Sequence, residues 1–187
     1  MIGVQDLRNG TTFLLDGQPY VALKYEHIKL GRGSATIKIK AKNLLSGAII
    51  DKSFVNSARV EEINTARRAM QYLYRGTGTY VFMDPQTYEQ VEILDSVIGD
   101  SGLYLVDGVQ VNVLFWDERP LWIELPPKME FTVAETDPGI KGNSAANMYK
   151  SATLDNGMTI RVPLFINQGD RLLVDTRDGS YVERVKS

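Results

Sequence analysis

An arginine stands between two glycines at Gly31-Arg32-Gly33, inside a stretch of the chain that is rich in basic residues. Residues 24–42 carry six lysines or arginines against one acidic residue, Glu26, a local excess of five positive charges. Glycines permit a tight reversal of the backbone, so they would present the arginine at the tip of a loop. A guanidinium offers a planar fork of donors and a face for stacking, which suits RNA. Gly-x-Gly alone fits an ordinary solvated hairpin tip better, whereas the basic strip suggests an element that docks on phosphate.

The rest of the chain offers little for catalysis. There are no cysteines, and the single histidine, His27, excludes most histidine-based metal sites and argues against a Ser-His-Asp triad. No phosphate-binding Gly-x-x-x-x-Gly-Lys-Ser/Thr loop and no nucleophile elbow is present. Asp84, Glu89, Glu92 and Asp95 are expected to form a solvated acidic face. We therefore predict a protein that is not an enzyme and has no cofactor and no metal site.

Charge is distributed unevenly along the 187 residues, whose net charge is -2. Residues 1–64 hold nine basic against six acidic residues, 65–128 hold five against nine, and 129–187 hold seven against eight. An acidic protein with one basic strip is expected to dock a single element on phosphate rather than to coat nucleic acid. No secretory signal and no apolar run of about 20 residues is visible, so we expect a cytoplasmic protein with no membrane partner.

The sequence around the loop predicts a succession of short β-strands. Asp16-Gly17 between two apolar runs predicts a hairpin, and residues 35–41 alternate apolar and basic as a half-buried strand does. Many short strands with regular turns favour small barrels or sandwiches. Boundaries are placed near Asn64 and at Pro126-Pro127-Lys128. Because units of about 60 residues are near the lower limit for an independent core, domain interfaces should help, above all between the first two.

Local expectations for the middle of the chain are more specific. Evidence for helix is thin, and the best candidate is 86–99, which offers one or two amphipathic turns before Gly99. Leu103–Val106, a turn at Asp107-Gly108 and 111–116 predict a hairpin. Trp116 and Trp122 are assigned to the hydrophobic core. Four strands are expected in the third set, at 130–133, 159–162, 171–174 and 181–184.

Several motifs together resemble the bacterial translation elongation factor P family over the whole length. They are KLGRGSA at 29–35, KNLLSG at 42–47, YVFMD at 80–84, TDPGIKGNSA at 136–145, KSATL at 150–154, VPLFI at 162–166 and VDTRDGSYVER at 174–184. The resemblance implies an all-β fold of three small barrels. These are a KOW/SH3-like barrel over 1–64 and OB-fold barrels over 65–128 and 129–187, in an L-shaped arrangement that mimics tRNA.

The resemblance also implies a function. The factor would bind the ribosome between the peptidyl and exit tRNA sites, as a monomer that touches both subunits, ribosomal RNA and peptidyl-tRNA. It would stimulate peptide bond formation at stalling sequences such as consecutive prolines. The expected RNA- and ribosome-binding residues are Lys29, Gly31, Arg32, Gly33, Ser34, Lys38, Lys40, Lys42, Gly142, Asn143, Ser144, Ala145, Asn147, Tyr181 and Arg184. Of these, 142–147 correspond to a loop near the exit-site codon of mRNA, and Tyr181 and Arg184 to residues facing the small subunit.

Members of the family carry a modification at the tip, and the residue at position 32 limits which modification is possible here. Members with lysine at the tip carry lysyl-type or amino-alcohol extensions, whereas some with arginine carry a rhamnose. Arg32 therefore implies either rhamnosylation by a glycosyltransferase or no modification, and Leu30 stands where many lysine-type members have proline. Two alternatives remain open: a paralogue resembling elongation factor P, and a generic single-stranded RNA-binding OB-fold protein.

Overall fold

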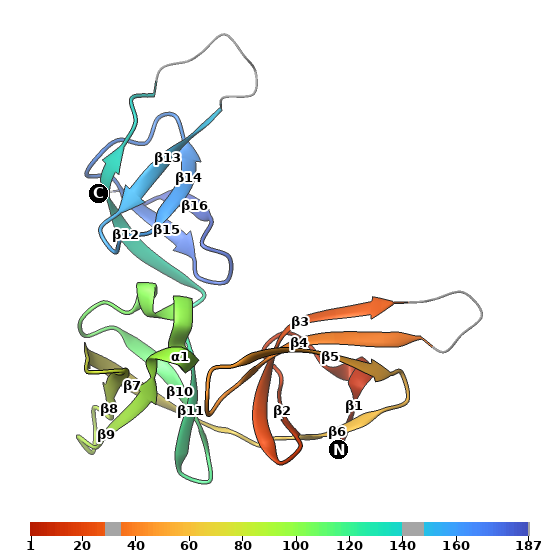
Figure 1. The fold of residues 1–187 in the computed structure, drawn as a ribbon. Coiled ribbons are helices and arrows are strands. Elements are labelled where there is room, and N and C mark those ends of the chain that lie inside the picture. The colour runs from red at the N-terminus through yellow and green to blue at the C-terminus, as the bar shows by residue number, and fades with distance from the viewer. Residues whose placement is uncertain (29–34, 140–147, 187) are drawn as a thin grey trace. The chain divides into compact units, whose positions relative to one another are not determined.

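A computed structural model describes residues 1–28, 35–139 and 148–186. Among these residues the regular structure is mostly β-strand, arranged in three antiparallel sheets (Figure 1). The chain divides into two compact units, one of Met1–Asp100 with Asp107–Glu124, the other of Ser101–Val106 with Leu125–Ser187. The all-β prediction is confirmed. The predicted L-shaped arrangement stays a prediction.

The first sheet has six strands and encloses the core of the first barrel. Its order is β1 (Ile2–Gly3), β6 (Arg59–Glu62), β2 (Thr12–Leu15), β3 (Gln18–Ile28), β4 (Thr36–Asn43) and β5 (Ile49–Val55), with the 3-10 helix η1 at Val4–Asp6. Asp16 and Gly17 both have positive φ and connect β2 to β3 as the predicted hairpin turn. Ile37, Ile39 and Ala41 of β4 point into the core, which confirms the predicted alternation.

The second sheet follows within the same unit. Its order is β11 (Arg119–Glu124), β10 (Gln110–Trp116), β7 (Ala66–Arg75), β8 (Thr79–Met83) and β9 (Gln90–Leu94). The edge strands β9 and β11 approach each other, so the sheet curls around its own core. The one-turn helix α1 (Asp95–Ile98) buries Val97 and Ile98 and continues into the 3-10 helix η2 (Gly99–Tyr104).

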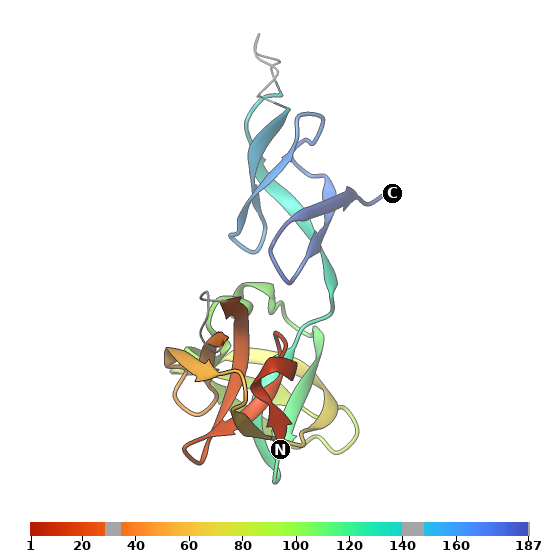
Figure 2. The same cartoon turned by 90° about the vertical axis from the view of Figure 1, so that its right-hand side faces the viewer.

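The third sheet belongs to the second unit. Its order is β14 (Thr159–Pro163), β13 (Tyr149–Leu154), β12 (Lys128–Thr136), β15 (Arg171–Asp175) and β16 (Tyr181–Arg184). Strands β14 and β16 come close, and the resulting curl is visible in the second view (Figure 2). The core is apolar on alternate positions, with Phe131, Val133, Leu154, Val162 and Leu172 buried.

One local prediction is confirmed and another was wrong. The helix expected before Gly99 is the single α-helical turn Asp95–Ile98, while 90–94 alternates like a strand and pairs with β8, where Ile93 faces Tyr80. Leu103–Val106 is not a hairpin strand. Leu103 and Tyr104 end η2, where the Tyr104 ring packs 6.0 Å from that of Phe131, and β10 pairs instead with β7 and β11. An apolar run of four residues satisfies either geometry, so packing decided between them.

Three other expectations also need correction. Strand β13 was missed, because its KSATL segment was taken only as a family motif. Asp95 is not part of a solvated acidic face: its Oδ2 accepts hydrogen bonds from Arg75 at 3.1 Å (Nε) and 2.5 Å (Nη2). Trp116 and Trp122 are half-buried rather than in the core.

Candidate nucleic-acid interface

The long hairpin of β3 and β4 carries the described part of the basic strip. The two strands pair up to Ile28 opposite Thr36, and the next residues, 29–34, lie outside the described part of the chain. Lys38 and Lys40 are exposed on the face of β4 opposite the core, as successive side chains of a strand require. Among the described residues, no carboxylate lies within ion-pair distance of either lysine. Both ammonium groups are therefore available to a phosphate.

Two lysines of this arm have acidic neighbours. Lys24 and Glu26 of β3 form an ion pair at 2.5 Å, which raises the pKa of Lys24 and lowers the pKa of Glu26. Asp51 of β5 is the cross-strand partner of Lys40. Exposed pairs of this kind contribute little to stability. Among the arm's described residues, Lys38 and Lys40 are the exposed lysines without an ion pair.

Lys42 has a different role from its neighbours on the same strand. It is 9% exposed, and its Nζ donates a hydrogen bond at 3.1 Å to the carbonyl oxygen of Val97 in α1. The ammonium also lies 4.9 Å from the ring centroid of Trp122 in β11. Burial lowers the pKa of Lys42, while the charge of Asp100 partly opposes that shift. Lys42 contacts the second barrel, and we therefore leave it out of the RNA-binding surface proposed below.

The residues that follow Lys42 complete this contact between the first two barrels. The side-chain Oδ1 of Asn43 accepts hydrogen bonds from the backbone N–H groups of Leu45 and Ser46, at 2.8 and 3.0 Å. That turn brings Gly47, with φ of 77°, against α1 so closely that a Cβ there would lie 2.1 Å from the carbonyl oxygen of Ser96. The KNLLSG motif thus fixes the base of the β3–β4 arm on the second barrel.

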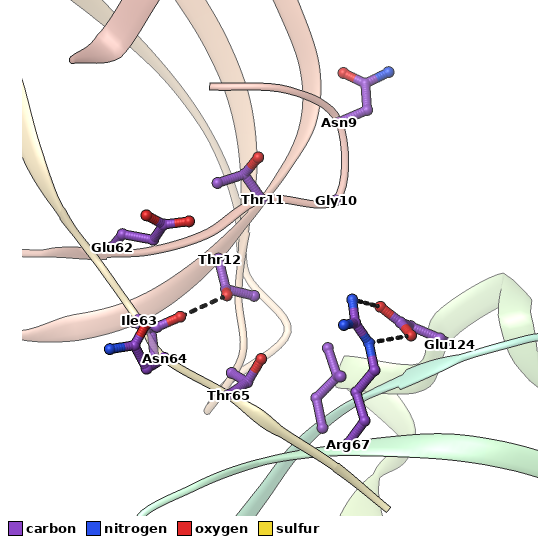
Figure 3. Close-up of a pocket in the computed structure, with 11 residues that line it drawn as sticks. Asn9, Gly10, Thr11, Thr12, Glu62, Ile63, Asn64, Thr65, Arg67 and Glu124 are labelled. Atoms are coloured by element: carbon purple, nitrogen blue, oxygen red, sulfur yellow. Dashed lines mark hydrogen bonds and ion pairs between the residues drawn. The ribbon is translucent and has the colours of Figure 1, made fainter. Parts of the chain in front are cut away.

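A polar pocket of about 520 Å³ lies where the chain passes from the first sheet to the second (Figure 3). Its lining residues are Asn9, Gly10, Thr11, Thr12, Glu62, Ile63, Asn64, Thr65, Arg67, Leu114 and Glu124. The one cation of the lining, Arg67, donates two hydrogen bonds to the carboxylate of Glu124, at 2.8 and 2.9 Å. Since that guanidinium is neutralised and Glu62 adds a negative charge, the pocket does not suit an anion.

Tyr181 and Arg184 stand at the two ends of β16 and have different neighbours. Tyr181 is half-buried and lines a groove with β13 and β14. Arg184 is exposed, with its guanidinium carbon 5.8 Å from the ring centroid of Phe165 and Nη1 3.8 Å from Asp170 Oδ2. Phe165 is itself 58% exposed. The structure therefore gives these two predicted residues separate surroundings, and it adds Phe165, which sequence reasoning missed, beside Arg184.

Ten of the predicted site residues lie outside the described residues. They are Lys29, Gly31, Arg32, Gly33, Ser34, Gly142, Asn143, Ser144, Ala145 and Asn147.

Three family models cover nearly the whole chain. Residues 3–60 match the elongation factor P KOW-like domain, 65–123 the elongation factor P OB domain, and 129–184 the elongation factor P C-terminal domain. The chain belongs to the elongation factor P family. Elongation factor P of Saccharopolyspora erythraea and that of Mycobacterium ulcerans are each 43% identical to it over 187 residues, the full length of both chains. A solved translation initiation factor 5A from Methanococcus jannaschii aligns with 66% of this chain and 92% of its own, with 24% identity and a TM-score of 0.46.

Membership in the elongation factor P family makes this protein a translation elongation factor rather than an enzyme. It implies interaction with the ribosome and tRNA. Among the described residues, no helix has the length and apolar character that a bilayer crossing needs.

Proposed function

We propose that this member of the elongation factor P family binds the ribosome between the peptidyl and exit tRNA sites and stimulates peptide bond formation at stalling sequences such as consecutive prolines. The observation that carries the proposal is the β3–β4 arm, whose base is fixed on the second barrel through Lys42 and Gly47. The segment with Arg32 connects these two strands in the sequence. A paired arm of eight to eleven residues can span roughly 25–35 Å, at about 3.3 Å a residue. It can therefore extend a cationic tip away from the barrel.

The mechanism we propose is positional. Arg32 contacts the acceptor end of peptidyl-tRNA with its planar donor fork, and Lys29, Gly31, Gly33 and Ser34 shape the loop around it. Holding the reacting ends in a productive geometry removes part of the entropic barrier without any covalent role for the factor. The buried contacts between the two barrels suit this task. They fix the base of the arm, and the position of the tip depends on that base.

The remaining contacts divide between the ribosomal subunits. Lys38 and Lys40 bind phosphates of RNA along the arm, since both ammonium groups are exposed and unpaired among the described residues. In the third barrel, Tyr181 and Arg184 face the small subunit and 142–147 approach the exit-site codon of mRNA. We take 1–64, 65–128 and 129–187 as the functional division of the chain, and expect a cytoplasmic monomer.

A reconstituted translation assay with a reporter containing consecutive prolines tests the function. The purified protein is expected to relieve the stall. Arg32→Ala removes charge-assisted hydrogen bonds worth about 1.5–3 kcal/mol, so stimulation should fall roughly ten- to a hundredfold. Arg59→Ala, an exposed arginine of the same barrel, is the matched control and should retain activity. Failure of the wild type to relieve the stall would refute the function, and full activity of Arg32→Ala would refute the role of the tip.

The state of Arg32 is a separate part of the proposal. Either a glycosyltransferase attaches rhamnose to its guanidinium or the side chain acts unmodified. The intact mass of protein purified from its native host separates the two, and resistance of the Arg32–Gly33 bond to trypsin locates the modification. An unmodified mass together with full activity would refute the hypothesis that Arg32 carries rhamnose.

A further inference from the structure

The third barrel carries a groove, and the proposed function assigns a role to only one of its lining residues. It has a volume of about 710 Å³ and lies on β13, β14 and β16. Its lining residues are Tyr149, Thr159, Ile160, Arg161, Pro163, Gly179, Ser180, Tyr181 and Val182. Only Tyr181 of these was expected to bind RNA.

Two aromatic side chains and one guanidinium form the wall of the groove. Tyr149 begins β13 and remains 54% exposed. Pro163 is its partner in β14, and Arg161, two residues earlier in that strand, brings its guanidinium carbon to 5.6 Å from the Tyr149 ring centroid. Tyr181 from β16 adds a second, half-buried ring. The wall of the groove thus combines two tyrosine rings with a guanidinium that lies over one of them.

Arg161 differs from the other arginines of this unit. Arg171 pairs with Glu130, Arg177 with Asp175, and Arg184 lies 3.8 Å from Asp170. Within the described residues, no carboxylate lies within ion-pair distance of Arg161. Among the described residues that line the groove, it is also the only charged one. The groove therefore has a net positive charge that an anion would complement.

Polar groups complete the chemistry of the groove. Ser180 Oγ donates a hydrogen bond at 2.7 Å to Asp178 Oδ1, which leaves its lone pairs free to accept one. Thr159 contributes a second hydroxyl, shared at 3.4 Å with that of Thr153. A ligand that matches all of these features has a flat ring, an anionic group beside it, and polar edges. An unpaired nucleotide has this combination, and base stacking on aromatic rings is how single-stranded RNA is commonly bound.

We propose that the groove binds one unpaired nucleotide of single-stranded RNA, with its base stacked on Tyr149 and Tyr181 and its phosphate on Arg161. The proposal rests on the proposed function, which brings this barrel to RNA on the ribosome. It assigns Tyr149 and Arg161, which no motif singled out, and it separates Tyr181 from Arg184, which is not among the groove's lining residues.

An NMR titration of the full chain with a hexa-adenylate RNA tests the site directly. Amide shifts are expected to cluster at Tyr149, Arg161, Ser180 and Tyr181. An abasic ribose-phosphate hexamer of equal charge should bind several times more weakly, since it offers phosphates without rings. Tyr149→Ala should weaken binding roughly tenfold, because stacking is worth about 1–3 kcal/mol per base, and Tyr149→Phe should retain it. Arg161→Ala should weaken binding to a similar degree.

Matched controls come from the other unit. Tyr74 is also 54% exposed, so Tyr74→Ala removes an equally exposed ring, and Arg119→Ala removes an exposed arginine. Neither should change RNA binding, and the NMR spectra of all variants report whether they are folded. Equal binding of RNA and abasic hexamer, unchanged affinity in both groove variants, or the absence of shifts at these residues would each overturn the proposal.

The ribosome assay separates this proposal from the function on which it rests. If the wild type relieves stalling but RNA leaves the groove unshifted, the groove fails and the function stands. If RNA fills the groove but stalling is not relieved, the function fails and the groove stands as an RNA site. If both hold, Tyr149→Ala should raise the factor concentration needed for half-maximal stimulation, whereas Arg119→Ala should not.

Discussion

The Nζ atom of Lys42 lies 4.9 Å from the ring centroid of Trp122, and this contact joins the first barrel to the second. The same ammonium donates to the carbonyl oxygen of Val97, at the end of a one-turn helix whose last carbonyls have no partner within the helix. Gly99 leaves room for it, since a Cβ there would lie 3.1 Å from Nζ. A lysine from one barrel thus caps a helix of the other.

The first prediction concerns the loss of this cap. Lys42→Ala leaves the Val97 carbonyl unpaired and exposes part of the Trp122 ring, and we expect it to lower the free energy of unfolding by about 1–3 kcal/mol. Both tryptophans lie in the first unit, so their fluorescence during urea unfolding measures this unit selectively. Lys40→Ala, an exposed lysine of the same strand, is the control and should stay within about 0.5 kcal/mol of wild type. Equal stability of the two variants would show that the Lys42 contact does not hold the barrels together.

Lys42 also shows where sequence reasoning reaches its limit. The alternation in 35–41 correctly placed Ile37 and Ile39 inside and Lys38 and Lys40 outside. The same rule places Lys42 outside, because strand periodicity describes only the faces of its own sheet. The second barrel covers that position, and no local pattern in the sequence announces a neighbour 55 residues away.

In the third barrel, one strand could be predicted from the sequence, whereas the contact between Tyr149 and Arg161 could not. Strand β16 has the predicted bounds, because Asp178-Gly179 gives a clear turn before it. Tyr149 and Arg161 stand twelve residues apart, and only the register of β13 with β14 brings them together. A candidate site that depends on register between strands is invisible until the pairing is known. Family motifs predicted the fold well, since they encode turns and cores, and they said nothing of this groove.

A second prediction isolates the close contact of Gly47 with α1. Gly47 and Gly17 have nearly equal positive φ, 77° and 75°, so alanine pays a similar backbone cost at both, about 1–2 kcal/mol. At Gly17 nothing lies within 4 Å of a Cβ, whereas at Gly47 it would meet Ser96 oxygen at 2.1 Å. Gly47→Ala should therefore be clearly more destabilising than Gly17→Ala, with faster amide exchange in α1. Similar losses at both positions would mean that the two barrels can separate without cost.

A third prediction concerns acid and the second unit. Two hydrogen bonds from the Arg177 guanidinium, at 2.9 and 2.5 Å, and one from its backbone N–H lower the pKa of Asp175 from 3.8 to about 2. A lowered carboxylate pKa stabilises the fold above the unfolded value, and the stabilisation is lost as pH falls from about 4 through about 2. Asp175→Asn should flatten the pH dependence of unfolding of this unit in that window.

Amide hydrogen exchange in β15, followed from pH 5 to pH 2, measures this dependence within the second unit. Asp155→Asn, an exposed carboxylate of the same barrel, serves as the control and should leave the acid limb as in wild type. If amide exchange in Asp175→Asn changes between pH 5 and pH 2 as it does in wild type, groups other than Asp175 cause the acid sensitivity of this unit.

The fourth prediction tests whether the β3–β4 arm contacts phosphate. Each lysine that neutralises a phosphate releases condensed counterions, so the logarithm of the binding constant falls with the logarithm of salt by about 0.7–0.9 per contact. Lys38→Ala with Lys40→Ala should therefore weaken ribosome binding and reduce the salt slope by about 1.5. Lys52→Ala removes an exposed lysine of β5 beside the same arm and should leave the slope unchanged. Binding measured between 50 and 200 mM salt separates a phosphate contact, which changes the slope, from a general loss of fold, which lowers affinity at every salt concentration. An unchanged slope in the double variant would mean that the arm reaches its target through the tip alone.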